Sequence, residues 1–434
     1  MKFYSTKNKH HKVSLRDAVV RGLAPDNGLY MPECIPQLPT SFFENISKRS
    51  FQENSFEVAK LLLGSEIPTS DLKRMVDHTV SFDAPLVHVG KNVFALELFH
   101  GPTLAFKDFG ARFMSQLLAY FSRQQEREIV ILVATSGDTG SAVANGFLGV
   151  EGTRVVVLYP SGKVSDIQEK QFTTLGKNVI ALEVEGTFDD CQRLVKQAFQ
   201  DENLRENYFL TSANSINIAR LIPQSFYYFQ AYSQLEDKSL PLVFSVPSGN
   251  FGNLTGGLIA KQMGLPVEHF VVSTNINDVV PEFLKTKIFQ PRPSVTTISN
   301  AMDVGNPSNF DRMMDLYNED FEKLSSDVSG YCVTDSETQL AMKSLSQEKG
   351  YTLDPHGAVA YCGLQKYSAK AKDDFNGIFL ETAHPGKFLE TVERTLGYQI
   401  QLPPVLQKFQ AGKKLAIEIN NDYNSFKRML ANVL

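Results

Sequence analysis

The sequence predicts an α/β protein with doubly wound, mostly parallel sheets in two halves and a small N-terminal domain. From about residue 92 onward, short apolar runs rich in β-branched residues alternate with longer segments of helical period. That alternation is typical of parallel strands that are buried on both faces and joined by helices. The chain has 434 residues, 42% of them hydrophobic, which suffices for two or three domains of roughly 150 residues each.

The first 80 residues have a different pattern, with helical stretches between turns marked by Pro and Gly, such as Ala24–Gly28. We therefore predict an N-terminal domain over residues 1–80. The main region, residues 81–434, is expected to comprise two α/β subdomains and a C-terminal helical tail, with a helix from Asn421 onward. Residues 281–311 carry four prolines and are expected to form an irregular surface insertion.

The elements of the main region are expected in the following order. The predicted strands are Ile129–Ala134, Val155–Tyr159, Val179–Val184, Phe209–Thr211, Leu242–Val246, Phe270–Ser273 and Ile378–Leu380. The predicted helices include Phe109–Phe121, Asp189–Ala198, Ile216–Gln234 and Phe388–Leu396. Each strand is a short apolar run, and each helix spaces its apolar residues at a helical period.

Composition excludes several classes of function. The net charge is −5, and no long block of Lys or Arg appears, which argues against a nucleic-acid or anionic-membrane surface. The four cysteines form no CxxC pair, so a zinc ribbon and a disulfide framework are not expected. The longest aliphatic run has six residues, Ile129–Ala134, against the ~20 needed to cross a bilayer. We expect a cytoplasmic protein without a metal site or an obligate protein partner.

Two small-residue loops follow predicted strands, where ligands gather in open α/β sheets. In the loop Gly249-Asn250-Phe251-Gly252-Asn253, glycine and asparagine tolerate positive φ, so backbone N–H groups can converge on an anion beside a helix N-terminus. An ordinary strand-to-helix turn explains this loop equally well. The second loop runs through Thr135, Ser136, Asp138 and Thr139, and its hydroxyls suit a carboxylate or phosphate.

Two further segments supply single candidate groups. Lys107 stands at the entrance of a predicted helix, and a partly desolvated lysine is a Schiff-base nucleophile. Thr382 stands at the end of a late strand. Taken singly, Lys107 could be a solvated lysine paired with Asp108, and Thr382 a capping residue. Together, the four segments fit pyridoxal phosphate with an amino-acid substrate.

The segment His100–Asp108, with the sequence HGPTLAFKD, closely resembles the pyridoxal-lysine signature of threonine synthases. Ser212–Asn217 with Arg220, and Gly249–Asn253, resemble two further blocks of that family in the same order. The opening Met1–Thr6 and the segment Ala24–Tyr30 resemble its N-terminal domain. The likeness covers nearly the whole chain and implies the fold of tryptophan synthase β-type pyridoxal enzymes.

The resemblance implies conversion of O-phospho-L-homoserine and water to L-threonine and phosphate. It implies that Lys107 forms the Schiff base with pyridoxal phosphate and then serves as acid and base, that Gly249–Asn253 holds the cofactor phosphate, and that Thr382 contacts the pyridine nitrogen. The implied substrate-binding residues are Thr135, Ser136 and Thr139 for the carboxylate, and Asn214, Ser215 and Arg220 for the phosphate. From its own position alone, Arg220 could equally be a surface helix residue.

The sequence departs from the family pattern at Asp138, which stands where many relatives have an asparagine that contacts the 3′ oxygen of the cofactor. An ionised Asp138 beside a phenolate would be repulsive. Either Asp138 is protonated, or it points elsewhere, or another residue makes that contact.

Three other functions are alternatives to the synthase. A phospho-lyase would release 2-oxobutyrate instead of adding water, and a serine or threonine dehydratase would share the fold. Arg220 with Asn214 and Ser215 favours a phosphorylated substrate, and the His100–Asp108 block favours the synthase. A silent binding or sensing protein on the same fold is disfavoured because Lys107 is retained.

Overall fold

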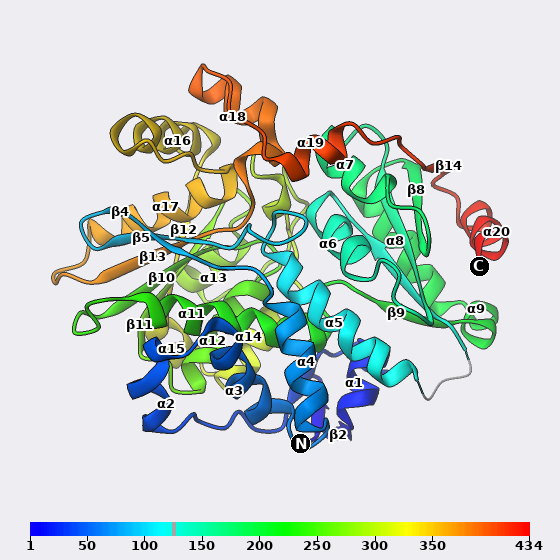
Figure 1. Cartoon of the computed structure of the whole chain (residues 1–434), viewed down its shortest axis with the longest axis horizontal. Helices are drawn as coiled ribbons and strands as arrows, with labels where there is room; N and C mark the ends of the chain where they lie inside the picture. The colour runs from blue at the N-terminus through cyan, green and yellow to red at the C-terminus, as the bar shows by residue number, and fades with distance from the viewer. Residues whose placement is uncertain (124–126) are drawn as a thin grey trace. The chain divides into compact units, whose positions relative to one another are not determined.

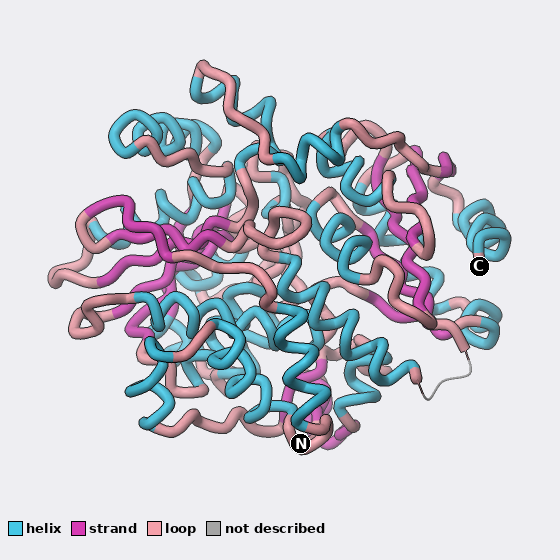
Figure 2. Tube along the Cα trace, in the orientation of Figure 1, coloured by secondary structure: helices cyan, strands magenta, loops and turns pink. Residues whose placement is uncertain are grey.

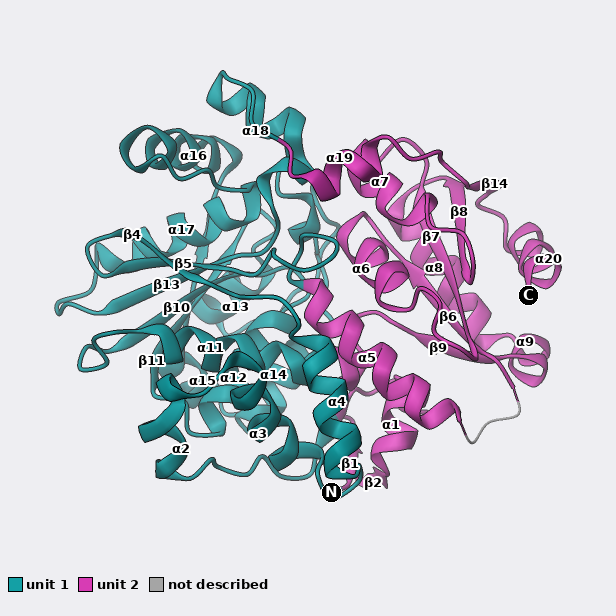
Figure 3. Cartoon of the chain, in the orientation of Figure 1, with its two compact units in different colours: residues 1, 31–106, 221–401 teal, residues 2–30, 107–220, 402–434 magenta. Residues whose placement is uncertain are grey.

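The computed structural model describes residues 1–123 and 127–434. Its contacts divide the chain into two compact units (Figure 3). Unit 1 comprises residues 1, 31–106 and 221–401, and unit 2 comprises residues 2–30, 107–220 and 402–434. The division at residue 80 stays a prediction, since the first 80 residues are shared between these two units.

Unit 1 is built on a six-stranded sheet with the order β12-β11-β10-β13-β5-β4. Its strands are β4 (Leu86–Gly90), β5 (Val93–Glu97), β10 (Leu242–Pro247), β11 (Val267–Thr274), β12 (Val328–Cys332) and β13 (Asn376–Glu381). All neighbours are parallel except β4 and β5, which form an antiparallel pair. Every residue of β10 and β13 is buried, as expected from their continuous apolar runs. The edge strands β4 and β12, and β5 beside β4, are only partly buried and give a weaker sequence signal.

Helices surround this sheet within unit 1 (Figures 1 and 2). They are α2 (Thr40–Asn45), α3 (Phe51–Leu63), α4 (Thr69–Thr79), α11 (Phe226–Gln234), α12 (Gly252–Gln262), α13 (Val279–Thr286), α14 (Phe310–Leu316), α15 (Phe321–Asp327), α16 (Asp335–Lys349), α17 (Pro355–Ser368) and α18 (Leu389–Leu396), with the 3-10 turns η1 (Ile46–Lys48), η2 (Ile222–Ser225), η3 (Asn300–Met302) and η4 (Pro385–Phe388). Helix α17 packs against β10, β11 and β13. Capping boxes start α3 at Ser50 and α16 at Thr334.

Unit 2 is built on a five-stranded, wholly parallel sheet with the order β14-β8-β7-β6-β9. Its strands are β6 (Ile129–Ala134), β7 (Thr153–Pro160), β8 (Val179–Glu185), β9 (Phe209–Ser212) and β14 (Ile417–Asn420). Its helices are α1 (Leu15–Arg21), α5 (Lys107–Ser122), α6 (Asp138–Gly146), α7 (Asp166–Thr173), α8 (Phe188–Gln200), α9 (Glu202–Asn207), α10 (Ile218–Leu221), α19 (Pro404–Gln410) and α20 (Tyr423–Val433). Helices α6 and α8 each contact β6 and β7. The α/β class, the mostly parallel sheets and the two halves are confirmed.

The N-terminal residues contribute a small three-stranded sheet with the order β2-β1-β3. Its strands are β1 (Phe3–Ser5), β2 (Asn8–Val13) and β3 (Tyr30–Pro32). Among the described residues, no helix has both the length and the apolar character that a membrane crossing requires.

Two segments differ from the sequence expectation. Ile216–Gln234, predicted as one helix, is divided into α10, η2 and α11, because Pro223 cannot continue a regular helix. Residues 281–311 are not all an irregular surface insertion. Helix α13 continues to Thr286, and beyond the exposed stretch 290–296 the chain returns to the interior, where Ser299, Met302 and Asn309 are buried.

Candidate active site

Lys107 is the first residue of α5, and the three residues before it are held against the chain after β13. The N–H of Phe106 donates to the carbonyl of Thr382 at 2.8 Å, and the N–H of His384 donates to the carbonyl of Leu104 at 3.0 Å. Ala105 and Ala383 form an antiparallel bridge between these two bonds. The chain up to Phe106, directly before Lys107, is therefore held to the strand end that carries Thr382.

A second lysine supports the same segment. The Nζ atom of Lys387, in η4, donates to the carbonyl of Thr103 at 2.8 Å, and both residues are fully buried. Leu104 adopts a positive φ of 55°, which a leucine rarely adopts unless the surrounding contacts impose it. The sequence gives no signal for Lys387, because a buried lysine is rare and cannot be told from a solvated one without the fold.

The loop between β10 and α12 has the features of a phosphate cradle. A Cβ added at Gly249 would lie 2.9 Å from the backbone of both Ala301 and Met302, so only glycine fits there. Phe251 precedes α12 in the left-handed conformation, with φ 62° and ψ 15°. The side chain of Asn253 donates to the carbonyl of Pro247 at 2.7 Å. Side chains of the bend itself thus stabilise it. Helix α12 begins directly after the bend, with its first N–H groups and the positive end of its dipole there.

In unit 2, the loop between β6 and α6 has a similar character. The Thr135 hydroxyl accepts from the N–H groups of Gly137 at 2.9 Å and Gly140 at 2.8 Å. Gly137 has a φ of 140°, in the region that favours glycine. Thr135 is 1% exposed, whereas Ser136 and Thr139 are partly exposed. Thr135 therefore shapes the turn, and Ser136 and Thr139 present the accessible hydroxyls.

Asp138 is bound by a residue that the sequence did not point to. The side-chain nitrogen of Gln168, on α7, donates to Oδ1 of Asp138 at 2.7 Å, and both side chains are buried. A Cβ at Gly137 would lie 2.6 Å from the Gln168 side chain, so the glycine makes room for the contact. Since Gln168 is 30 residues away along the chain, only the packing of α6 against α7 brings it to Asp138.

Arg220 lies buried in unit 2, and it is not a surface residue. It is 4% exposed, and its Nη1 donates to the carbonyl of Ala213. A Cβ at Gly110 would lie 2.7 Å from Nε of Arg220, so α5 packs directly on the guanidinium. Burial lowers the pKa of Arg220 to about 10, and nearby Asp108 opposes that shift. Arg220 thus keeps its charge at neutral pH. Asn214 and Ser215, in the same segment, are partly exposed.

Thr382 follows a buried acid, Glu381, which is 0% exposed. The N–H of Asp354 donates to Glu381 Oε2 at 3.4 Å. Burial raises the pKa of Glu381 well above its usual range, and the neighbouring carboxylate of Asp354 adds to the shift. Asp354 in turn caps α17, since its oxygens accept from the N–H groups of His356 and Gly357. Burial therefore favours the neutral form of Glu381.

The predicted residues thus fall into two sets. Unit 1 carries Gly249–Asn253 and Thr382, and unit 2 carries Asp138, Asn214, Ser215, Arg220 and the Thr135–Thr139 loop, with Lys107 as its first residue after Phe106. Among the described residues, no group of three or more His, Cys, Asp or Glu is arranged to hold a metal, and all four cysteines are free thiols.

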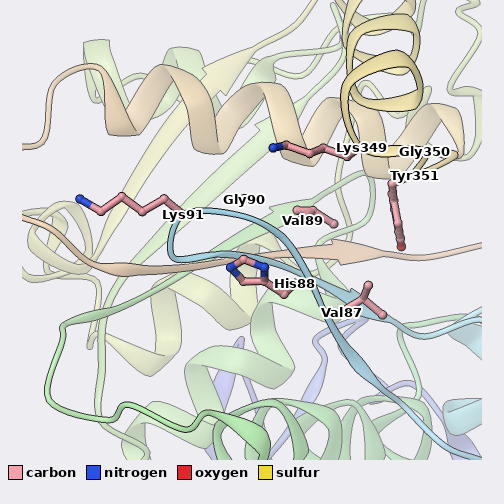
Figure 4. A pocket seen from close by; sticks show the side chains of 8 residues that line it. All are labelled: Val87, His88, Val89, Gly90, Lys91, Lys349, Gly350 and Tyr351. Atoms are coloured by element: carbon pink, nitrogen blue, oxygen red, sulfur yellow. The ribbon is translucent and has the colours of Figure 1, made fainter.

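A surface hollow of about 330 Å³ lies elsewhere in unit 1, beside the β4–β5 turn and the end of α16 (Figure 4). Its lining comprises Val87–Lys91 and Lys349–Tyr351. The Lys91 side chain extends away from the other lining residues (Figure 4). It contains none of the residues that the sequence predicted.

Three family profiles cover the chain. The profile described as "Threonine synthase N terminus" matches residues 2–80, "Pyridoxal-phosphate dependent enzyme" matches residues 80–377, and "Threonine synthase, C-terminal" matches residues 357–430.

Relatives of known function match over the full length. The threonine synthase of Haemophilus influenzae is 48% identical over 431 residues, which is 99% of each chain. The crystal structure of the Escherichia coli threonine synthase has a TM-score of 0.93 and 43% identity, and covers all of both chains. The PLP-bound threonine synthase of Brucella melitensis has a TM-score of 0.93 and 34% identity, and covers 100% of this chain and 99% of that one.

Proposed function

Because the chain belongs to the threonine synthase family of pyridoxal-phosphate-dependent lyases, we propose that its substrate is O-phospho-L-homoserine and that Lys107 is its catalytic residue. The product is then L-threonine with release of phosphate. The assignment of Lys107 rests on how the chain directly before it is held in place. The segment before it is bonded on both sides of the Ala105–Ala383 bridge to the strand end that carries Thr382.

The residues of this chain fit the cofactor. The Gly249–Asn253 bend offers backbone N–H groups and a helix N-terminus, which suit a phosphate dianion. Thr382 offers a hydroxyl, which can bond the pyridine nitrogen without protonating it. Bound pyridoxal phosphate supplies the electron sink that lets C–H and C–O bonds of an amino acid break.

Lys107 is proposed to carry the protons of the reaction. Its free amine takes the Cα proton and then a Cβ proton, and after phosphate leaves it delivers a proton to Cγ. Water then adds its hydroxyl at Cβ and its proton goes to the released phosphate, and Lys107 returns a proton to Cα. Lys107 is partly buried, and these steps need its neutral amine.

The substrate ends are assigned to unit 2. We assign the carboxylate to Ser136 and Thr139 with the N-terminus of α6, while Thr135 holds their turn in shape. We assign the γ-phosphate to Asn214 and Ser215, with the buried charge of Arg220 stabilising it from behind. Gln168 donates to one oxygen of Asp138, so we propose that Asp138 contacts the cofactor 3′ oxygen only as the neutral acid, whose other oxygen donates the proton and avoids repulsion between two anions. We also propose that the protein is cytoplasmic.

The test uses the protein loaded with pyridoxal phosphate and supplied with O-phospho-L-homoserine. Phosphate, threonine and 2-oxobutyrate are measured together. Equal amounts of phosphate and threonine support the proposal, whereas phosphate with 2-oxobutyrate makes the protein a phospho-lyase. Absence of phosphate release rejects the substrate.

The Lys107→Ala variant tests the catalytic lysine. We expect it to fold and to lose turnover, and Lys163→Ala, at an exposed lysine of the same unit, is the matched control. Full activity in Lys107→Ala contradicts the mechanism.

A further inference from the structure

The steps proposed above make no use of Arg312, which has the largest fully buried side chain in the described part of the molecule. It lies on α14 in unit 1 and is 0% exposed. Burial lowers its pKa to about 9, and Asp311 and Asp315 oppose the shift. The guanidinium is therefore still charged at pH 7. Burying a charge is costly unless the charge is paired and hydrogen-bonded.

Arg312 is connected to the phosphate cradle through a single buried side chain, Asn309. Nη1 of Arg312 donates to Oδ1 of Asn309 at 2.8 Å. Nδ2 of Asn309 donates to the backbone carbonyl of Asn250 at 2.8 Å, and the N–H of Asn309 reaches the same oxygen at 3.3 Å. Asn309 is fully buried, so no water competes for these bonds.

The direction of these bonds matters for an anion. The carbonyl of Asn250 shares its peptide unit with the N–H of Phe251. Each amide in the series accepts at its oxygen and donates from its nitrogen, so the dipoles align from the guanidinium toward Phe251. Aligned hydrogen bonds in a low-dielectric interior polarise one another. The positive charge of Arg312 thus strengthens the Phe251 N–H as a donor.

Neighbouring contacts fix the same bend. The backbone N–H and Oγ of Ser308 donate to Oδ1 of Asn250, at 3.3 and 3.0 Å. These bonds turn the Asn250 side chain toward residues 308–309. Phe251 keeps its left-handed conformation only while its surroundings enforce it. The segment 299–312 is thus the support of the cradle.

We propose that Arg312 is a positioning residue for the phosphate group of the cofactor and acts through Asn309 on the Asn250–Phe251 peptide. This inference rests on the proposed assignment of the Gly249–Asn253 loop to that phosphate. A purely structural Arg312, serving only to neutralise Asp315, would leave the affinity for the phosphate unchanged relative to the rest of the cofactor.

The test compares two ligands on the cofactor-free protein: pyridoxal phosphate, and pyridoxal, which lacks the phosphate. Equilibrium dissociation constants are measured for both with the wild type, Arg312→Met and Asn309→Asp. In Asn309→Asp the carboxylate still accepts from Arg312 but cannot donate to Asn250, so this variant keeps the arginine paired if Arg312→Met fails to fold. Arg394→Met, at an exposed arginine of the same unit, is the matched control.

We expect both variants to bind pyridoxal phosphate roughly tenfold more weakly, as for the loss of a hydrogen bond to a charged group. Their affinity for pyridoxal should change less than threefold. The phosphorus-31 resonance of the bound cofactor should also move in both variants, and neither measurement should change in Arg394→Met. Equal weakening of both ligands, or no change in either, overturns the role of Arg312. A wild type that binds pyridoxal as tightly as pyridoxal phosphate overturns the cradle assignment itself.

Discussion

Replacing Glu381 with glutamine should stabilise this protein at neutral pH, although Glu381 is completely buried beside Thr382. Burial and the Asp354 carboxylate raise the pKa of Glu381 well above the ordinary value of 4.5. The unfolded chain ionises this group near pH 4.5, whereas burial in the folded chain favours the protonated form at higher pH. Its contribution to stability is complete below about pH 4.5 and is lost as the pH rises toward the raised pKa.

The size of the effect follows from proton linkage. At a pH above the unfolded value, each pH unit over which the folded chain keeps the proton costs about 1.4 kcal/mol of unfolding free energy. Glutamine needs no proton. Its oxygen can accept from the N–H of Asp354, as Oε2 of Glu381 does, and its NH₂ can donate to the Asp354 carboxylate. We expect Glu381→Gln to be about as stable as the wild type near pH 4.5, and more stable at pH 7 by at most about 3 kcal/mol.

Urea unfolding followed by circular dichroism at pH 5 and pH 7 measures the difference. Other titrating groups are common to both proteins and cancel in the comparison. Glu348→Gln, at an exposed glutamate of the same unit, controls for the loss of a carboxylate and should change little at either pH. A Glu381→Gln protein that is less stable than the wild type at pH 7, or whose difference does not depend on pH, would refute the claim that Glu381 is neutral.

Three further predictions concern the same region and unit 2. Gly249→Ala places a methyl group 2.9 Å from the Ala301 backbone, so we expect the affinity for pyridoxal phosphate to fall at least tenfold in a cofactor titration; unchanged affinity would separate the bend from the phosphate. Burial lowers the pKa of His384 to about 4, below its unfolded 6.5, so its contribution to stability is complete above pH 6.5 and lost as the pH falls through 4. His384→Asn should flatten that dependence in melting experiments by up to roughly 3 kcal/mol, and an equally steep profile would contradict it. Gly110→Ala forces Arg220 to move. We expect the free energy of unfolding to fall by about 1–3 kcal/mol, as is typical of overpacking, and the KM for the phosphorylated substrate to rise. A normal KM would argue against the role of Arg220.

Much of the architecture was predictable from the sequence, because the central strands are continuous apolar runs. The strands predicted from Ile129–Ala134 to Ile378–Leu380 are all present. A continuous apolar run identifies a buried parallel strand even when the strands that pair with it are not known. The edge strands β4 and β12, and β5 beside β4, escaped prediction because they are half exposed and mix polar with apolar residues. The division of Ile216–Gln234 was signalled by Pro223, but the helical period on both sides concealed it.

The sequence by itself determined the fold class and the residues that carry chemical groups of a distinctive kind: the lysine block around Lys107, the Gly249–Asn253 loop and the hydroxyl-rich Thr135–Thr139 loop. Each is a local run whose meaning depends on residues next to one another. Only the tertiary structure revealed that Gln168, Glu381 and Arg312 act on the predicted site residues or their neighbours. Their roles arise from burial and from contacts between segments far apart in the chain, and neither the desolvation of a charge nor the direction of a hydrogen bond is encoded in neighbouring residues.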